Sequence, residues 1–221
     1  MLKRIPRFQL NPMLIFTISI LLMGCSSAYY GTMEKLGYHK RDLMVNRVES
    51  ARDAQQEAKE QFESALEKFS HVLKVDGGEL EEKYEQLKTA YDKSNDRAET
   101  VRDRIEAVED VSEALFEEWQ AELDQYTSDS LRRSSARKLK QTRRQYTQLI
   151  GAMKRAEKKM EPVLSAFHDQ VLFLKHNLNA RAIASLQTEL VSVEAEVNSL
   201  IRDMEASIKE ADAFIDAMAK E

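Results

Sequence analysis

Five side chains of this 221-residue chain are of the types that most often bind metals or act as nucleophiles: the single cysteine, Cys25, and four histidines. The histidines are at positions 39, 71, 168 and 176, and no two have the i, i+4 spacing that places two ligands on one helical turn. A single thiol excludes an internal disulfide framework and a thiolate metal cluster. The sequence has no glycine-rich phosphate-binding motif. We therefore expect no catalytic residues, no cofactor and no metal, and hence no enzyme.

Cys25 has a different role, which its neighbours indicate. Three basic residues near the start precede an uncharged apolar stretch, 13–23, that is short for a membrane span and typical of a signal peptide. The residues Leu-Met-Gly-Cys at 22–25 resemble the lipobox of bacterial lipoproteins, in which the signal is cut before the cysteine and acyl chains are attached there. We predict a signal peptide over 1–24 and lipidation of Cys25. The alternatives are a signal anchor and a secretory peptide with a free thiol.

The residue after the cysteine bears on localisation. In Gram-negative lipoproteins an aspartate there favours retention in the inner membrane, whereas a serine, here Ser26, permits transport onward. By this resemblance we expect the protein at the periplasmic face of the outer membrane, with the acyl chains as the membrane contact.

Net charge bears on the possible partners. Without the signal, 30 basic residues stand against 38 acidic ones, a net charge of −8 that disfavours nucleic-acid binding.

The rest of the chain has the pattern of long helices. After residue 37 there are only three glycines and one proline. Apolar positions recur in alternating steps of three and four residues over 44–72, 80–123, 139–174 and 186–218, which is the 3.5-residue period of supercoiled helices. No stretch alternates with a period of two, so we expect no sheet.

Three breaks divide these stripes. Asp76-Gly77-Gly78 can end a helix, residues 127–130 are a cluster of N-cap types, and residues 176–179 offer a turn without Gly or Pro. Pro162 should bend its helix without ending it. We predict an all-α, elongated antiparallel bundle of four long helices over residues 44–221, after a lipidated tether at 25–43. If residues 176–179 do not turn, the alternative is a three-helix rod.

Charge supports the second hairpin of this bundle. Residues 106–124 hold eight acidic side chains and no basic one, and residues 130–156 hold nine basic side chains and no acidic one. Folding at 127–130 would pair Glu117 with Lys140, Glu113 with Arg144 and Asp124 with Arg133. This turn would lie at the same end as the anchor. The basic run therefore has a second interpretation, an anion or lipid-headgroup contact through Arg132, Arg133, Arg137 and Lys138.

Residues 27–42 and 173–186 do not follow the seven-residue pattern. "YYGTMEKLGYHKRDLMVNRVESARDAQ", which begins at Tyr29, and "FLKHNLNARAIASL", at 173–186, resemble the proteobacterial family known as domain of unknown function 2959. The resemblance would cover nearly all of the chain after Cys25. It implies a helical envelope lipoprotein and supplies no activity or catalytic residues.

Two functional hypotheses follow. The first is a structural or adaptor rod, tethered to the outer membrane, that contacts envelope proteins or other copies of itself. The second is a carrier that binds an apolar ligand or lipid in or on the bundle. The alanines at 51, 58 and 65 favour close packing and so argue against a cavity. We expect no small-molecule substrate for the first role.

Overall fold

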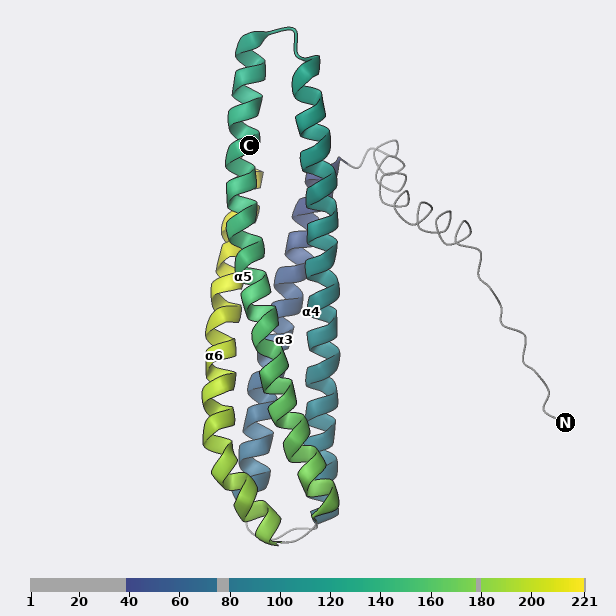
Figure 1. Ribbon diagram of the computed structural model, residues 1–221, viewed down its shortest axis with the longest axis vertical. Coiled ribbons are helices and arrows are strands. Elements are labelled where there is room, and N and C mark those ends of the chain that lie inside the picture. Colours follow the sequence, from purple (N-terminus) through teal and green to yellow (C-terminus); the bar gives the residue numbers. More distant parts are fainter. Residues whose placement is uncertain (1–38, 75–79, 178–179, 221) are drawn as a thin grey trace, which may run out of the picture.

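The computed structural model describes residues 39–74, 80–177 and 180–220, which form four long helices (Figure 1). These are α3 (Lys40–Lys74), α4 (Leu80–Glu122), α5 (Asp129–His176) and α6 (Ala180–Ala219), with a short 3-10 helix, η1 (Leu123–Gln125), after α4. The predicted four-helix, antiparallel, all-α fold is confirmed. The three-helix rod is wrong, because α5 ends at His176 and α6 packs back against it.

The helix ends follow from local chemistry. The hydroxyl of Ser128 caps α5, accepting a hydrogen bond from the backbone N–H of Leu131 at 3.5 Å. At the other end of α5 the backbone N–H of Asn177 bonds the carbonyl of Leu174 at 3.1 Å, and the Asn177 side chain bonds the carbonyl of Phe173. Pro162 lies inside α5, which continues through it. The predicted Gly77-Gly78 break lies outside the described residues, between α3 and α4.

The helices form a four-cornered bundle in which each packs against two neighbours. Helix α3 contacts α4 and α6, and α5 also contacts α4 and α6. The two ends of the α3–α6 pair are tied by hydrogen bonds, from Arg41 to the carbonyl of Met218 and from Gln187 to the carbonyl of Leu73. Neighbouring helices therefore run antiparallel along the whole rod.

The core is built from the predicted stripes. Every predicted position of α3 from Met44 to Val72 is buried, including the three small alanines at 51, 58 and 65. The ring of Phe167, from α5, stacks between Phe62 and Phe69 of α3 with centroid separations of 6.4 and 4.4 Å. One predicted stripe position is polar in both α3 and α6, and there Ser207 donates to the amide oxygen of Gln55 at 2.8 Å. The seven-residue period thus selects the buried faces.

The four helices differ in length, whereas the sequence predicts helices of matching length. Helices α4 and α5 have 43 and 48 residues, whereas α3 and α6 have 35 and 40. The longer pair consequently projects beyond the shorter pair at the end where α3 begins (Figure 1). Among the described helices, none is long and apolar enough to cross a bilayer.

Candidate functional site

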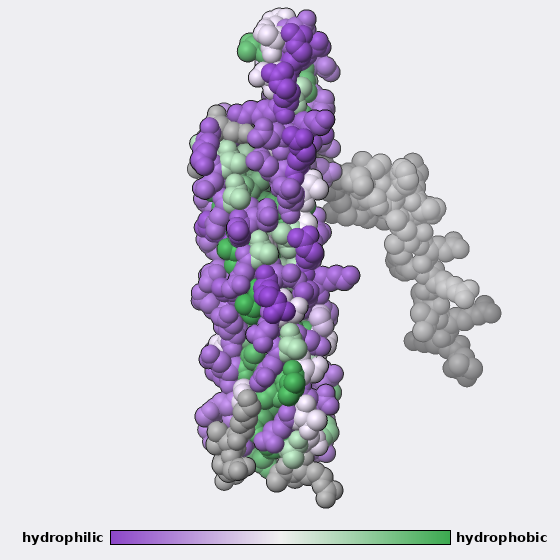
Figure 2. All heavy atoms as spheres, turned by 90° about the vertical axis from the view of Figure 1, so that its left-hand side faces the viewer, coloured by the Kyte–Doolittle hydropathy of each residue, from purple (hydrophilic) through white to green (hydrophobic). Residues whose placement is uncertain are grey.

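The projecting end of the α4–α5 hairpin is the candidate site, and we call residues 119–144 the hairpin tip. The ammonium of Lys40, in the first turn of α3, lies 2.7 Å from a carboxylate oxygen of Glu118 on α4. Ser128 lies ten positions after Glu118, so the tip extends about 15 Å past the start of α3 at a helical rise of about 1.5 Å per residue. Figure 2 shows it as a narrow projection above the wider bundle. As predicted, the turn and the start of the first helix are at the same end.

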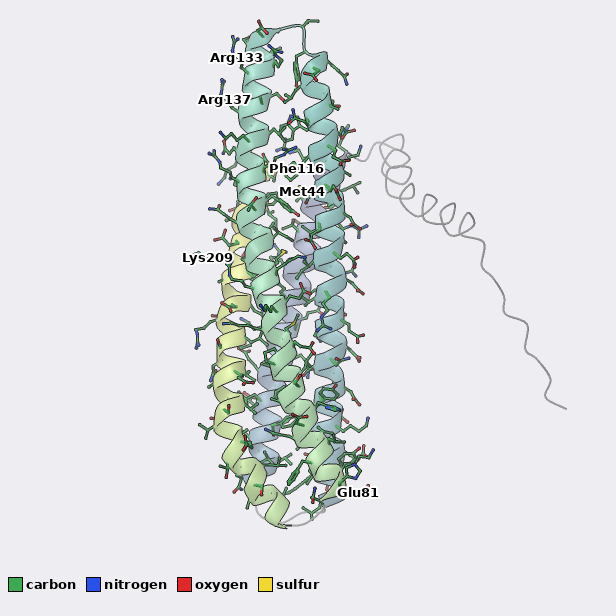
Figure 3. All side chains as sticks on the ribbon, viewed as in Figure 1. Met44, Glu81, Phe116, Arg133, Arg137 and Lys209 are labelled. Carbon is green, nitrogen blue, oxygen red and sulfur yellow. The ribbon has the colours of Figure 1, made fainter. Side chains whose placement is uncertain are left out.

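The four basic residues predicted as an anion contact all belong to this tip. Arg132, Arg133 and Arg137 are exposed and Lys138 is half-buried. Arg132 pairs with Asp129 at 2.9 Å within the first turn of α5. Figure 3 shows Arg133 and Arg137, one turn apart, pointing away from the bundle on the same side. The structure therefore brings three of the four to the surface together.

The predicted ion pairs between the two charge runs do not form, although α4 and α5 pack close to the predicted register. The indole of Trp119 donates to Ser135 and Arg143 donates to the carbonyl of Phe116, and these two contacts lie on either side of the predicted pairing. Among the described residues, Glu117–Lys140, Glu113–Arg144 and Asp124–Arg133 do not form ion pairs. Instead Glu109 pairs with Lys154 at 2.8 Å, whereas the predicted register would place Gln148 opposite Glu109. The two charge runs do meet between α4 and α5, through the Glu109–Lys154 pair.

Because the predicted pairs do not form, a basic stripe is exposed on the tip. Arg133, Arg137, Lys140 and Arg144 follow one another at steps of four, three and four residues, so they share one face of α5, and all four are exposed. From Ser130 to Arg144 the helix carries seven basic side chains and no acidic one. The stripe is therefore a continuous cationic surface on α5 at the projecting end of the rod.

Two exposed apolar side chains flank the turn and were missed by sequence reasoning. Tyr126 is 41 % exposed and Leu131 is 59 % exposed. Their only signal in the sequence is that they are apolar residues lying off the seven-residue stripe, next to polar cap residues. An aromatic and an aliphatic side chain beside arginines is the combination that suits a membrane–water interface.

A groove of about 590 Å³ lies beside the stripe, between α4 and α5. Its apolar lining includes Leu123, Ala136 and Leu139, and Lys140, Arg143 and Arg144 supply its basic groups. The guanidinium of Arg143 is placed by Phe116, whose ring it covers at 5.4 Å and whose carbonyl accepts its hydrogen bond at 3.1 Å. An apolar floor with cations around it suits an amphipathic anion.

The cysteine and the histidines that the sequence analysis considers do not form a site in the described residues. Cys25 and the predicted signal peptide lie outside the described residues. His39, His71, His168 and His176 are all exposed. Within the described ranges, no group of three or more potential ligands is placed to hold a metal ion.

Comparison with known proteins identifies the family. Residues 29–218 match the model of the family described as "Protein of unknown function (DUF2959)", which covers nearly all of the helical region. The chain belongs to the DUF2959 family. This match confirms the family predicted from the sequence. No curated protein and no solved structure matches the chain significantly.

Proposed function

We propose that this DUF2959 protein is a lipid-anchored rod on the periplasmic face of the outer membrane, serving as a structural or adaptor protein. The observation that carries the proposal is the position of the hairpin tip, at the end of the rod where the chain enters from Cys25. The opposite end, near Glu81, would then be presented to envelope proteins or to other copies of the chain (Figure 3).

The tether is long enough for the tip to reach the lipid surface. Lys40 lies fifteen positions after Cys25, and an extended chain of fifteen residues spans at most about 50 Å. The tip projects only about 15 Å past Lys40. Arg133 and Arg137 would meet anionic headgroups, while Tyr126 and Leu131 would enter the interface. The acyl chains supply the anchor, and the tip sets the rod's orientation.

Replacing the acylated residue tests the anchor. In cells carrying Cys25→Ser, we expect an unacylated precursor that no longer sediments with the outer membrane. Thr32→Ala, farther along the predicted tether, is the matched control and should fractionate as the wild type does. Co-sedimentation of the Cys25→Ser protein with outer membrane after a salt wash would mean that lipid is not what holds the protein there.

The carrier hypothesis remains a second candidate because of the apolar groove on the tip. Its floor of Leu123, Ala136 and Leu139 could bind one acyl chain, with Arg143 or Arg144 on the headgroup. Native mass spectrometry of the unacylated protein distinguishes the two roles. Bound lipid that is lost on Leu139→Glu would favour the carrier, and lipid-free protein would favour the rod.

A further inference from the structure

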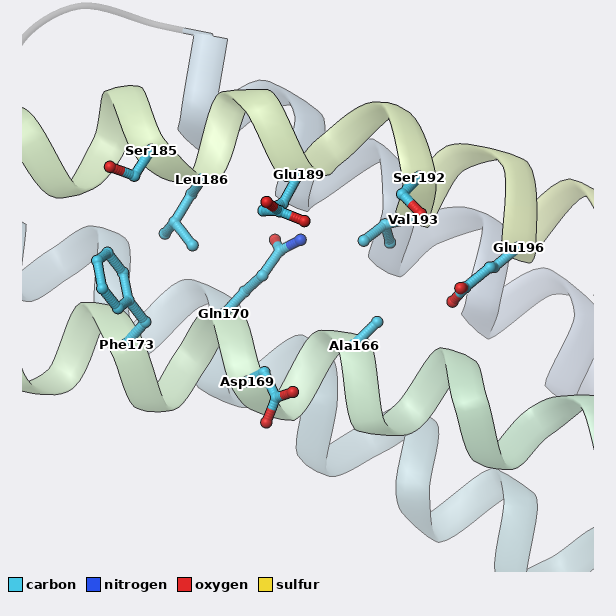
Figure 4. A pocket seen from close by; sticks show the side chains of 10 residues that line it. All are labelled: Ala166, Asp169, Gln170, Phe173, Ser185, Leu186, Glu189, Ser192, Val193 and Glu196. Carbon is cyan, nitrogen blue, oxygen red and sulfur yellow. The ribbon is translucent and has the colours of Figure 1, made fainter.

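A second groove lies between α5 and α6, toward the end of the rod opposite the hairpin tip. It has a volume of about 510 Å³. We call it the α5–α6 groove; its lining includes Asp169, Gln170 and Phe173 from α5, and Leu186, Glu189 and Val193 from α6 (Figure 4). Leu186 and Val193 are buried, so the apolar floor belongs to the core, while Glu189 is exposed.

Gln170 is the unusual member of this lining. Its side chain is only 4 % exposed, and neither its amide nitrogen nor its amide oxygen has a hydrogen-bond partner. Buried polar side chains are nearly always hydrogen-bonded. Gln55 of the same core accepts from Ser207 and leaves only its amide nitrogen without a partner, whereas both amide atoms of Gln170 have none. Figure 4 shows the Gln170 amide directed across the groove toward α6, beside Glu189 and Val193. Both a donor and an acceptor are thus available from one buried group.

The charges around this amide are of one sign. Asp169, Glu189 and Glu196 line the groove, and its lining contains no basic residue. Outside the lining, the nearest lysines of α5 are Lys175, which is exposed, and Lys159, which is paired with Asp203 at 2.5 Å. Phe173 lies at one end of the groove and is 41 % exposed. A ligand that complements these groups carries positive charge, an amide and an aliphatic stem.

We infer that the α5–α6 groove binds a basic peptide segment. A peptide carbonyl accepts from Nε2 of Gln170 and the neighbouring peptide N–H donates to its Oε1, which satisfies both halves of the buried amide. A lysine or arginine of the segment pairs with Glu189 or Asp169, and its methylene stem packs on Phe173. The inference names a class of partner for the adaptor role proposed above. Peptide binding itself does not depend on that role, but its purpose in the cell rests on it.

Binding is measured with the purified full-length chain, in non-ionic detergent and at low salt, by calorimetric titration. The probe is the capped tripeptide acetyl-Lys-Ala-Lys-amide. Spermidine supplies the cations without the peptide groups, and acetyl-Glu-Ala-Glu-amide supplies the peptide groups with the opposite charge. We expect the basic peptide to bind more tightly than spermidine and the acidic peptide not to bind.

The variant Gln170→Leu keeps the side-chain volume and removes the amide. It should weaken the basic peptide about tenfold, the loss expected from two modest hydrogen bonds. Gln86→Leu, at an exposed position of α4 outside both the groove and the hairpin tip, is the matched control and should bind as the wild type does. Glu189→Gln should also weaken binding, and added salt should reduce the difference from the wild type.

Three results would overturn the inference: no binding of the basic peptide by the wild type, equal affinity in Gln170→Leu, or spermidine binding as tightly as the peptide. If Gln170→Leu fails to fold, the side-chain amide signals of Gln170 in the wild type decide, because they must shift when the peptide is added. These measurements need no membrane, so they fail or succeed independently of the Cys25→Ser fractionation.

Discussion

The ammonium of Lys40 lies 2.7 Å from a carboxylate oxygen of Glu118, which fixes the level at which α3 starts along α4. The side chains are 9 % and 28 % exposed, so this contact is better shielded from water than the other ion pairs along the rod, such as Lys88–Asp92 at 45 % and 49 %. Everything in α4 and α5 beyond this contact belongs to the projecting tip.

A double-mutant cycle measures the Lys40–Glu118 contact. Lys40→Met and Glu118→Gln should each destabilise the protein, and the coupling between them should be about 1–2 kcal/mol, as expected for a partly buried charge-assisted hydrogen bond. The cycle is needed because Lys40 has a further interaction that the single variant also removes. The exposed pair Lys88–Asp92 is the control and should show a smaller coupling. A Lys40–Glu118 coupling no larger than that of the control would contradict the proposed start of the tip.

Charge reversals test which charged side chains of α4 and α5 pair. Lys154→Glu should lower the unfolding free energy by about 0.5 kcal/mol, since the pair with Glu109 is exposed, and adding Glu109→Lys should restore most of it. Lys140→Glu with Arg144→Glu should leave the melting temperature nearly unchanged and weaken binding to vesicles that contain anionic phospholipid.

The opposite pattern would support the ion pairs predicted from sequence. In that case Lys140→Glu with Arg144→Glu would lower the melting temperature, and Glu117→Lys with Glu113→Lys would recover it. Rescue is the informative readout, because loss of basic charge alone cannot produce it.

Tyr146 should give a measurable pH dependence. Burial raises the pKa of its phenol above the usual 10.0, and the hydrogen bond with Ser112 offsets this only in part. Because the folded state favours the neutral phenol, its contribution to stability is complete below pH 10 and declines as the pH rises through the higher folded pKa. The difference in tyrosinate absorbance between wild type and Tyr146→Phe should therefore titrate with a midpoint above 10. A midpoint at or below 10 would show that the ring is hydrated.

The sequence predicts the helices well because their signals are local. Alternating steps of three and four residues select the buried faces, and cap residues such as Ser128 mark where helices end. Asn177 ends α5 without help from Gly or Pro, and even this weak break is at the predicted place.

Relations between helices are harder to predict because they depend on side chains that meet in three dimensions. The charge runs indicate that α4 and α5 are partners but not which opposed side chains reach one another, so Lys140 lies on the exposed basic stripe instead of in the predicted ion pair. How far the hairpin tip projects depends on where α3 begins. The sequence predicts a tether up to residue 43, whereas α3 begins at Lys40. Gln170 looks like an ordinary helix residue, since sequence periodicity carries no information on whether a buried amide has a partner.

The orientation of the rod on the membrane is the central claim, and depth-dependent fluorescence quenching tests it most directly. The proposed acylation would block Cys25, so a cysteine introduced at Ser130 or at Glu81 would be the only thiol that a fluorophore can label. In vesicles with nitroxide-labelled lipids, the probe at 130 should be strongly quenched and the probe at 81, at the far end of the rod, should not (Figure 3). Equal quenching at both positions, or quenching at 81 alone, would contradict the account.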